Sequence, residues 1–387
     1  MKKIISLILS LSFVLLTFSA CNDSAPKIDS SDEYIEGQDA QENCIAYQMT
    51  ANVASSPDSY YLSTLNYLYV IDKKTHKCMP LCTRPDCLHE NEKPSYNCEA
   101  SDKGGIVFYM NSLYYQTEEE KTDANGVKYR VWEICRMNPD GTDKTVVFQT
   151  SEFLIWRFKM HRGYIYMEIS YPNDGGGYSS QNAVIIRVPV DGGEVEQIEE
   201  LKDNRSLLDL RFYRNNMYLL YEEAVEGVDE NDYPDYLWHY DLTTMERENL
   251  NEKLDYPICF LFTIYNGKIL YTDSKTWTKL CECDLDGSNN RIVTDFEDVF
   301  GKGTYEYYTV LSNDGEKLLV SASKPVSTED ESIIGDKIMI VCDKNYENIE
   351  SYDIPEGSQL NMFFEPESML FFRAWRRLSE FARRCRF

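Results

Sequence analysis

Basic residues and histidines are scarce in this sequence of 387 residues. Lysine and arginine number 39 against 65 aspartates and glutamates, there are only 4 histidines, and the formal net charge is −26. A surface of that sign repels the phosphate backbone of nucleic acids, so we expect no nucleic-acid partner. No two of the histidines stand at the spacing of metal ligands: His76, His89, His161 and His239.

Several catalytic motifs are also missing from the sequence. There is no Gly-x-Ser-x-Gly nucleophile elbow and no His-Glu-x-x-His zinc protease motif. The nearest approach to a phosphate-binding loop, Gly301-Lys302-Gly303-Thr304, lacks the upstream glycine. These absences leave an enzymatic activity uncertain and favour a protein that is not an enzyme.

Long apolar runs are absent except at the amino terminus. The apolar residues 4–18 follow a basic start and are too short for a comfortable membrane span, which predicts an export signal peptide over residues 1–20. Phe18-Ser19-Ala20-Cys21 resembles the lipobox of bacterial lipoproteins. The resemblance implies that Cys21 is lipidated and holds the chain to the outer face of the cell membrane. The alternative is a plain signal peptide that is cleaved after Ala20.

The segment that follows the signal peptide has few large apolar residues. Residues 21–42 are rich in serine, aspartate and glutamate, which predicts a solvated acidic tether. No later stretch approaches ~18 consecutive apolar residues, so we expect no transmembrane helix.

Aromatic residues, in contrast, are abundant. The 29 Tyr, 17 Phe and 5 Trp favour strands over helices. A short apolar strand, usually preceded by a glycine, asparagine or serine turn, recurs at intervals of 49–53 residues, marked by Tyr61, Tyr114, Ile165, Tyr218, Ile269, Leu318 and Leu370. A period of this length indicates one supersecondary unit repeated along the chain.

Each repeat also contains a hairpin signal. Asp140-Gly141, Asp191-Gly192 and Asp286-Gly287 lie between alternating strands, where glycine supplies the positive φ of a tight turn. About four strands per repeat predict an all-β fold, a β-propeller of about seven four-stranded blades over residues 43–372. The alternative is a set of two or three β-sandwiches, which would not require a constant period.

One turn carries a family resemblance. The segment 312–318, Ser-Asn-Asp-Gly-Glu-Lys-Leu, resembles the turn of TolB-like propeller repeats. The whole arrangement is similar to exported lipoproteins of Gram-positive anaerobes, a domain of unknown function with a cysteine-rich insertion after the first blade. The resemblance implies the scaffold and the export, but no particular activity.

The carboxyl end does not match the other repeats. Leu370 starts a seventh copy, but too few residues follow it for a whole blade, so we expect the last blade to be truncated. Residues 373–387 contain six arginines and one glutamate in a mildly amphipathic, helix-like pattern. They are either a genuine basic tail or the aberrant end of a truncated gene. Residues 43–50 are a candidate strand for closing the ring with the last blade.

The cysteine-rich insertion, residues 78–98, is the sharpest local feature. It contains Cys78, Cys82, Cys87, His89 and Cys98. Disulfides are the expected arrangement in an exported chain. Alternatively, Cys82, Cys87, His89 and Cys98 supply three sulfurs and one nitrogen, enough for tetrahedral zinc. Structural Zn or Ca is the only cofactor we consider, and the acidic residues 229–232 fit no calcium loop.

Two functions remain open. The first is a surface-anchored module that binds a protein, peptide or glycan through propeller loops. The second is a carboxylate-dependent, glycan-active enzyme at the mouth of the channel. Aromatic side chains that can stack on sugars, although most of them are expected to pack between blades, are Tyr164, Tyr166, Tyr171, Tyr178, Tyr218 and Trp238.

Overall fold

The computed structural model describes most of the chain beyond the amino-terminal region. The described residues are 32–39, 44–45, 53–63, 67–87, 89, 98–101, 103–172, 178, 183–201, 205–229, 233–313, 316–325, 337–354, 358–365, 368–373 and 382–386. The predicted signal peptide and Cys21 lie outside them. No helix among the described residues is long and apolar enough to cross a membrane.

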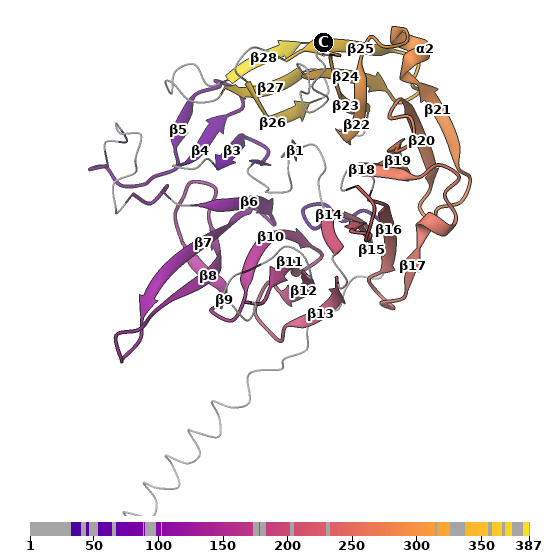
Figure 1. Ribbon diagram of the computed structural model, residues 1–387. Coiled ribbons are helices and arrows are strands. Elements are labelled where there is room, and N and C mark those ends of the chain that lie inside the picture. The colour runs from indigo at the N-terminus through magenta and orange to yellow at the C-terminus, as the bar shows by residue number, and fades with distance from the viewer. Residues whose placement is uncertain are drawn as a thin grey trace, which may run out of the picture.

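The described strands form four-stranded antiparallel sheets around a common centre (Figure 1). The first three sheets comprise β2 (Val53–Ser55), β3 (Ser59–Ser63), β4 (Leu68–Asp72), β5 (Cys78–Pro80); β6 (Gly104–Tyr109), β7 (Ser112–Thr122), β8 (Lys128–Met137), β9 (Thr145–Thr150); and β10 (Leu154–His161), β11 (Tyr164–Ser170), β12 (Val184–Pro189), β13 (Glu196–Glu200).

The next three sheets comprise β14 (Arg205–Tyr213), β15 (Asn216–Glu223), β16 (Asp235–Asp241), β17 (Arg247–Asn249); β18 (Ile258–Tyr265), β19 (Lys268–Asp273), β20 (Lys279–Asp284), β21 (Arg291–Asp295); and β22 (Glu306–Asn313), β23 (Lys317–Ser323), β24 (Lys337–Asp343), β25 (Ile349–Asp353). Two short helices, η2 (Leu250–Glu252) and α2 (Phe296–Phe300), lie in connections between blades. These six sheets are blades 1 to 6, each folded from one continuous stretch of chain. The predicted all-β propeller is therefore confirmed.

The prediction of about seven successive blades, the last one truncated, is wrong. Six blades follow one another, and the chain after them joins a sheet shared by both ends: β1 (Cys44–Ile45), β26 (Ser358–Glu365), β27 (Ser368–Arg373) and β28 (Ala382–Arg386). The sequence pattern missed β28, because its helix-like spacing hid a strand that pairs with β27. The expected closing strand does form, since Cys44 and Ile45 pair with Phe363 and Met362 of β26.

The blades pack face to face because their middle strands are apolar on both sides. All seven residues of β11 are buried, whereas the outer strand β13 is largely exposed. One apolar cluster joins Ile134 of blade 2 to Ile165 and Met167 of blade 3. Equivalent clusters lie between the other successive blades. Burying a large apolar side chain contributes about 1.5–3 kcal/mol, so these interfaces stabilise the ring.

Part of the predicted tether lies against the propeller. Residues 32–39 contact the turns after the inner strands of three successive blades: the Met110 amide donates to Gly37 O (3.3 Å), and the Arg162 amide donates to Gln38 O (3.1 Å). Arg214 forms an ion pair with Asp32 (3.5 Å). This segment is thus docked at the edge of the ring that carries these turns.

A buried ion pair fixes the end of the docked segment. Arg162 donates to both carboxylate oxygens of Asp39, from Nε (2.6 Å) and Nη2 (3.1 Å). Asp39 is only 6% exposed and Arg162 only 3% exposed. Removing one partner of such a pair strongly destabilises the fold, because the other charge is left buried without a partner.

We predict that Asp39→Asn destabilises the protein by about 3–5 kcal/mol, because Arg162 keeps its charge and loses its carboxylate. Urea unfolding measures the loss. The matched control is Glu36→Gln, which removes an exposed carboxylate from the same segment and should change the free energy of unfolding by less than about 0.5 kcal/mol. Equal stability of the two variants would contradict the anchoring role of Asp39.

Candidate functional site

The inner strands of the blades share a local irregularity. In six of the inner strands the pairing register shifts near the start: Gly104/Ile106, Ile155/Arg157, Leu207/Asp209, Ile258/Phe262, Glu306/Thr309 and Gln359/Met362. A β-bulge adds an unpaired residue and turns its side chain away from the regular alternation. These bulges place extra side chains at the edge of the ring where the inner strands begin.

Three aromatic side chains meet at that edge, and we call Phe260, Trp277 and Tyr307 the aromatic platform. The ring centroids of Phe260 and Trp277 are 5.7 Å apart, and those of Trp277 and Tyr307 are 5.9 Å apart. Phe260 is 48% exposed and Tyr307 is 46% exposed. The platform therefore presents aromatic surface to solvent across blades 5 and 6.

The backbone beneath the platform is fixed by hydrogen bonds. Buried Asp273 accepts from the Thr276 amide (3.1 Å), and the Trp277 amide donates to Asp273 O (3.0 Å). The Tyr308 amide of blade 6 donates to Trp277 O (3.1 Å). These bonds hold Trp277 and Tyr307 at φ values of 59° and 54°, and Phe260 has a φ of 47°. Bulky residues rarely adopt this left-handed region, which costs of order 1–3 kcal/mol each.

Two carboxylates of blade 4 border the platform. Asp235 Oδ2 accepts from the Phe260 amide (2.8 Å), and Asp235 lies opposite Glu222 in the β15–β16 pair. Burial raises the pKa of Asp235 to about 7; the nearby charge of Glu222 raises it further, and the Phe260 hydrogen bond opposes the shift. A carboxyl group that is partly protonated at neutral pH is able to donate or accept a hydrogen bond.

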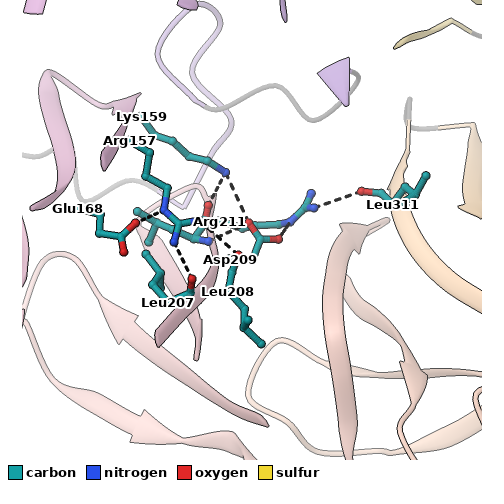
Figure 2. A network of polar contacts seen from close by, with 9 residues as sticks. Arg157, Lys159, Glu168, Leu207, Leu208, Asp209, Arg211 and Leu311 are labelled. Atoms are coloured by element: carbon teal, nitrogen blue, oxygen red, sulfur yellow. Dashed lines mark hydrogen bonds and ion pairs between the residues drawn. The ribbon is translucent and has the colours of Figure 1, made fainter. Parts of the chain in front are cut away.

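A network of charged side chains crosses from blade 3 to blade 4 near the centre of the ring (Figure 2). Arg157 pairs with Glu168 and donates to Leu207 O (2.6 Å) of β14. Lys159 donates to Leu210 O. Burial raises the pKa of Glu168, and the charge of Arg157 opposes that shift. This part of the network attaches β10 to β14.

The same network continues to blade 6. Arg211 donates to Asp209 Oδ2 (2.6 Å) and to Leu311 O of β22 (3.2 Å), as Figure 2 shows. Burial acts to raise the pKa of Asp209, but the charges of Arg211 and Lys159 outweigh it and lower the pKa. The Arg157–Glu168 pair lies within blade 3, and the Arg211–Asp209 pair lies within blade 4. The blades are connected by the hydrogen bonds that these arginines donate to backbone carbonyls of another blade.

The cysteine-rich insertion brings four predicted residues together. Cys82, Cys87, His89 and Cys98 present donor atoms that all lie within 4.8 Å of one another. Cys78 lies in β5, outside this group. The structure forms no disulfide among the described cysteines of the insertion. Thr83 donates from its amide to Glu99 (3.1 Å), which joins the two halves of the insertion.

The other predicted residues are spread over the blades. His161 is fully buried, its Nε2 lies 2.5 Å from Arg214 O, and burial lowers its pKa to about 4. His239 stacks on Tyr218. Of the predicted sugar-stacking residues, Tyr164, Tyr166 and Tyr218 are buried and Tyr171 is exposed.

The platform was not predicted from the sequence, because its three residues are far apart in the chain and belong to no motif. Phe260 and Tyr307 lie on bulges, whose extra residue breaks the alternation that a reader of the sequence would follow. The one available signal is Asp273-Ser274-Lys275-Thr276-Trp277, in which an Asp-Ser turn precedes a tryptophan.

Comparisons with known proteins concern only the fold. No protein-family model and no curated protein matches this chain. Among solved structures, the β-propeller domain of the Trilobed protease from Pyrococcus furiosus is 9% identical, with 89% of this chain and 93% of that chain covered and a TM-score of 0.46. A prolyl endopeptidase is 11% identical with a TM-score of 0.48, and the match covers 87% of this chain but spans only 48% of that chain. An oligogalacturonate lyase from Vibrio parahaemolyticus is 11% identical, with 77% and 75% covered and a TM-score of 0.43. At these identities and TM-scores the likenesses say nothing of activity.

Proposed function

We propose that this protein is an exported, lipid-anchored binding module whose ligand is an uncharged glycan that stacks on the aromatic platform. The observation that carries the proposal is a group of three adjoining aromatic rings, of which Phe260 and Tyr307 are exposed and Trp277 is half-buried. Aromatic faces with a few polar groups beside them are the usual composition of a small-ligand site. Sugar rings present apolar C–H faces to such rings, and their hydroxyl groups can bond to Asp235 and Glu222.

The arrangement of the two edges of the ring supports this function. In blade 4, Arg214 lies at the edge where residues 32–39 dock, whereas Asp235 lies at the opposite edge, at the start of β16. If Cys21 carries the lipid, residues 21–32 reach at most about 40 Å from the membrane when fully extended. The docked segment then holds the ring with its aromatic platform facing away from the membrane.

The charge of the protein limits the chemical class of the ligand. A formal net charge of −26 repels polyanions such as acidic polysaccharides. Glu222 and Asp235 add acidic groups beside the platform itself. A neutral glycan fits these features better than an anionic one, and a peptide is an outcome that the binding test below would reveal.

A second function is favoured by one specific observation. Glu222 and Asp235 form a pair of carboxylates in which one pKa is raised to about 7, the pattern of a general acid beside an ionised partner. In a glycan-active enzyme Asp235 would give its proton to the leaving group, and Glu222 would remain ionised. Asp235→Asn would then abolish turnover of a glycan and leave its binding intact.

We predict that Trp277→Ala weakens binding of a neutral glycan at least about tenfold, equivalent to about 1.4 kcal/mol, because it removes the central ring of the platform. Thermal-shift screening of the full chain with neutral glycans, acidic glycans and peptides identifies the ligand, and calorimetry then measures the affinity.

The control for this test is Tyr129→Ala, which removes an exposed aromatic side chain (42%) from β8, away from the platform. Circular dichroism checks that both variants fold. Equal affinity of Trp277→Ala and the wild type, or a response to peptides alone, would refute the glycan proposal.

We also predict that the raised pKa of Asp235 makes folding depend on pH. The folded carboxyl keeps a proton between its ordinary pKa of 3.8 and about 7, while the unfolded one has lost it. The stability that Asp235 contributes is therefore complete below its ordinary pKa of 3.8 and is lost as the pH rises to about 7. Relative to Asp235→Asn, the wild type should lose about 2–3 kcal/mol between pH 5 and pH 8 in urea unfolding.

The control for the pH experiment is Glu226→Gln, which changes an exposed carboxylate in the loop before β16. Its stability should follow that of the wild type at both pH values. Parallel pH profiles for Asp235→Asn and the wild type would show that Asp235 titrates normally.

A further inference from the structure

We infer that Cys82, Cys87, His89 and Cys98 form a structural zinc site. Their four donor atoms all lie within 4.8 Å of one another, which is the spacing that one central ion requires. Three cysteines and one histidine complete a tetrahedral shell and leave no position open for a substrate. The site therefore belongs to the class that stabilises a fold rather than the class that catalyses a reaction.

The histidine is the observation that separates a metal from a disulfide. His89 Nε2 is buried and has no hydrogen-bond partner among the described residues. His89 also has a φ of 52°, a strained conformation that brings its ring to the three thiols. A disulfide would use two of the three sulfurs and explain neither the odd thiol nor the histidine. A bound cation would give His89 Nε2 a partner and would use all three thiols.

The chemistry of the donors selects the metal. Calcium and magnesium take oxygen ligands, and this group offers none. Thiolate and imidazole in tetrahedral geometry are the ligands of zinc, and cobalt is able to replace it as a spectroscopic probe. Of the two structural metals expected from the sequence, zinc fits these four residues and calcium does not.

The place of the site in blade 1 shows what the metal would do. The outer strand β5 has only three residues, and Cys82 and Cys87 lie in the loop that follows it. Cys98 is buried in the core of blade 1 with Tyr67 and Tyr69. A metal bound by both segments would tie the loop after β5 to residues 98–101 beside the core of blade 1.

The experiment measures metal and thiols on the same sample. The full chain, purified without chelator and incubated with one equivalent of zinc, should retain about one zinc per chain after the excess is removed. Thiol counts in denaturant should be equal before and after reduction, because the insertion contains no disulfide. Replacement by cobalt should give the intense visible bands of tetrahedral thiolate coordination.

Two cysteine variants test whether zinc binds to the proposed donor group or elsewhere in the insertion. Cys87→Ser should lose the retained zinc, whereas Cys78→Ser, a cysteine of the same insertion outside the donor group, should keep it. If Cys87→Ser fails to fold, the zinc content and the cobalt spectrum of the wild type still decide the question. A wild type that retains no zinc overturns the inference. So would two additional thiols on reduction of the wild type that are absent on reduction of Cys87→Ser, because they would place a disulfide in the insertion.

Discussion

The structure depends on covering both faces of each small sheet. A middle strand such as β11, with all seven residues buried, cannot face water on either side. Each blade must therefore lie between two others, and only a ring gives every blade two neighbours. The pairing of Cys44 and Ile45 with β26 brings the two ends of the chain into one sheet, which makes closure a property of the whole chain. Blade 1 ends in a short outer strand, β5, and cysteines of the insertion pack against the core of this blade.

Because the faces of the blades are occupied by packing, the groups available for function lie at the strand ends. The two edges of the ring differ in what they carry. One edge holds residues 32–39 through the ion pair of Asp39 and Arg162, and the other displays Phe260, Trp277 and Tyr307. Near the centre, arginine side chains connect blades 3, 4 and 6 through hydrogen bonds to backbone carbonyls. A ligand at the platform would thus meet a surface held by rigid strands, which limits the entropy lost on binding.

The repeat and its turns were predictable because they depend on local chemistry. Asp140-Gly141 and Asp286-Gly287 form the expected turns, with φ values of 87° and 79° at the glycines. The burial of Cys135, Cys281, Cys283 and Cys342 also follows from their places in alternating strands. The platform could not be predicted, since it depends on bulges that bring side chains of two strands next to a side chain of one loop. The last sheet was misread for a similar reason: β28 has the spacing of a helix, and only its partner β27 makes it a strand.

The three residues of the platform share a strained backbone conformation with other turn residues, such as Met245. Phe260, Trp277 and Tyr307 each adopt a positive φ, a conformation that glycine or asparagine accepts at little cost. Each strained residue costs of order 1–3 kcal/mol. The cost of all three is a sizeable fraction of the free energy of unfolding of a typical domain, about 5–15 kcal/mol. Partial exposure of the rings recovers little of this cost through the hydrophobic effect. What distinguishes these three residues is that their rings lie together, with neighbouring centroids 5.7 and 5.9 Å apart, and that Phe260 and Tyr307 are about half exposed. A surface of adjoining rings is the feature that a stacking ligand would require.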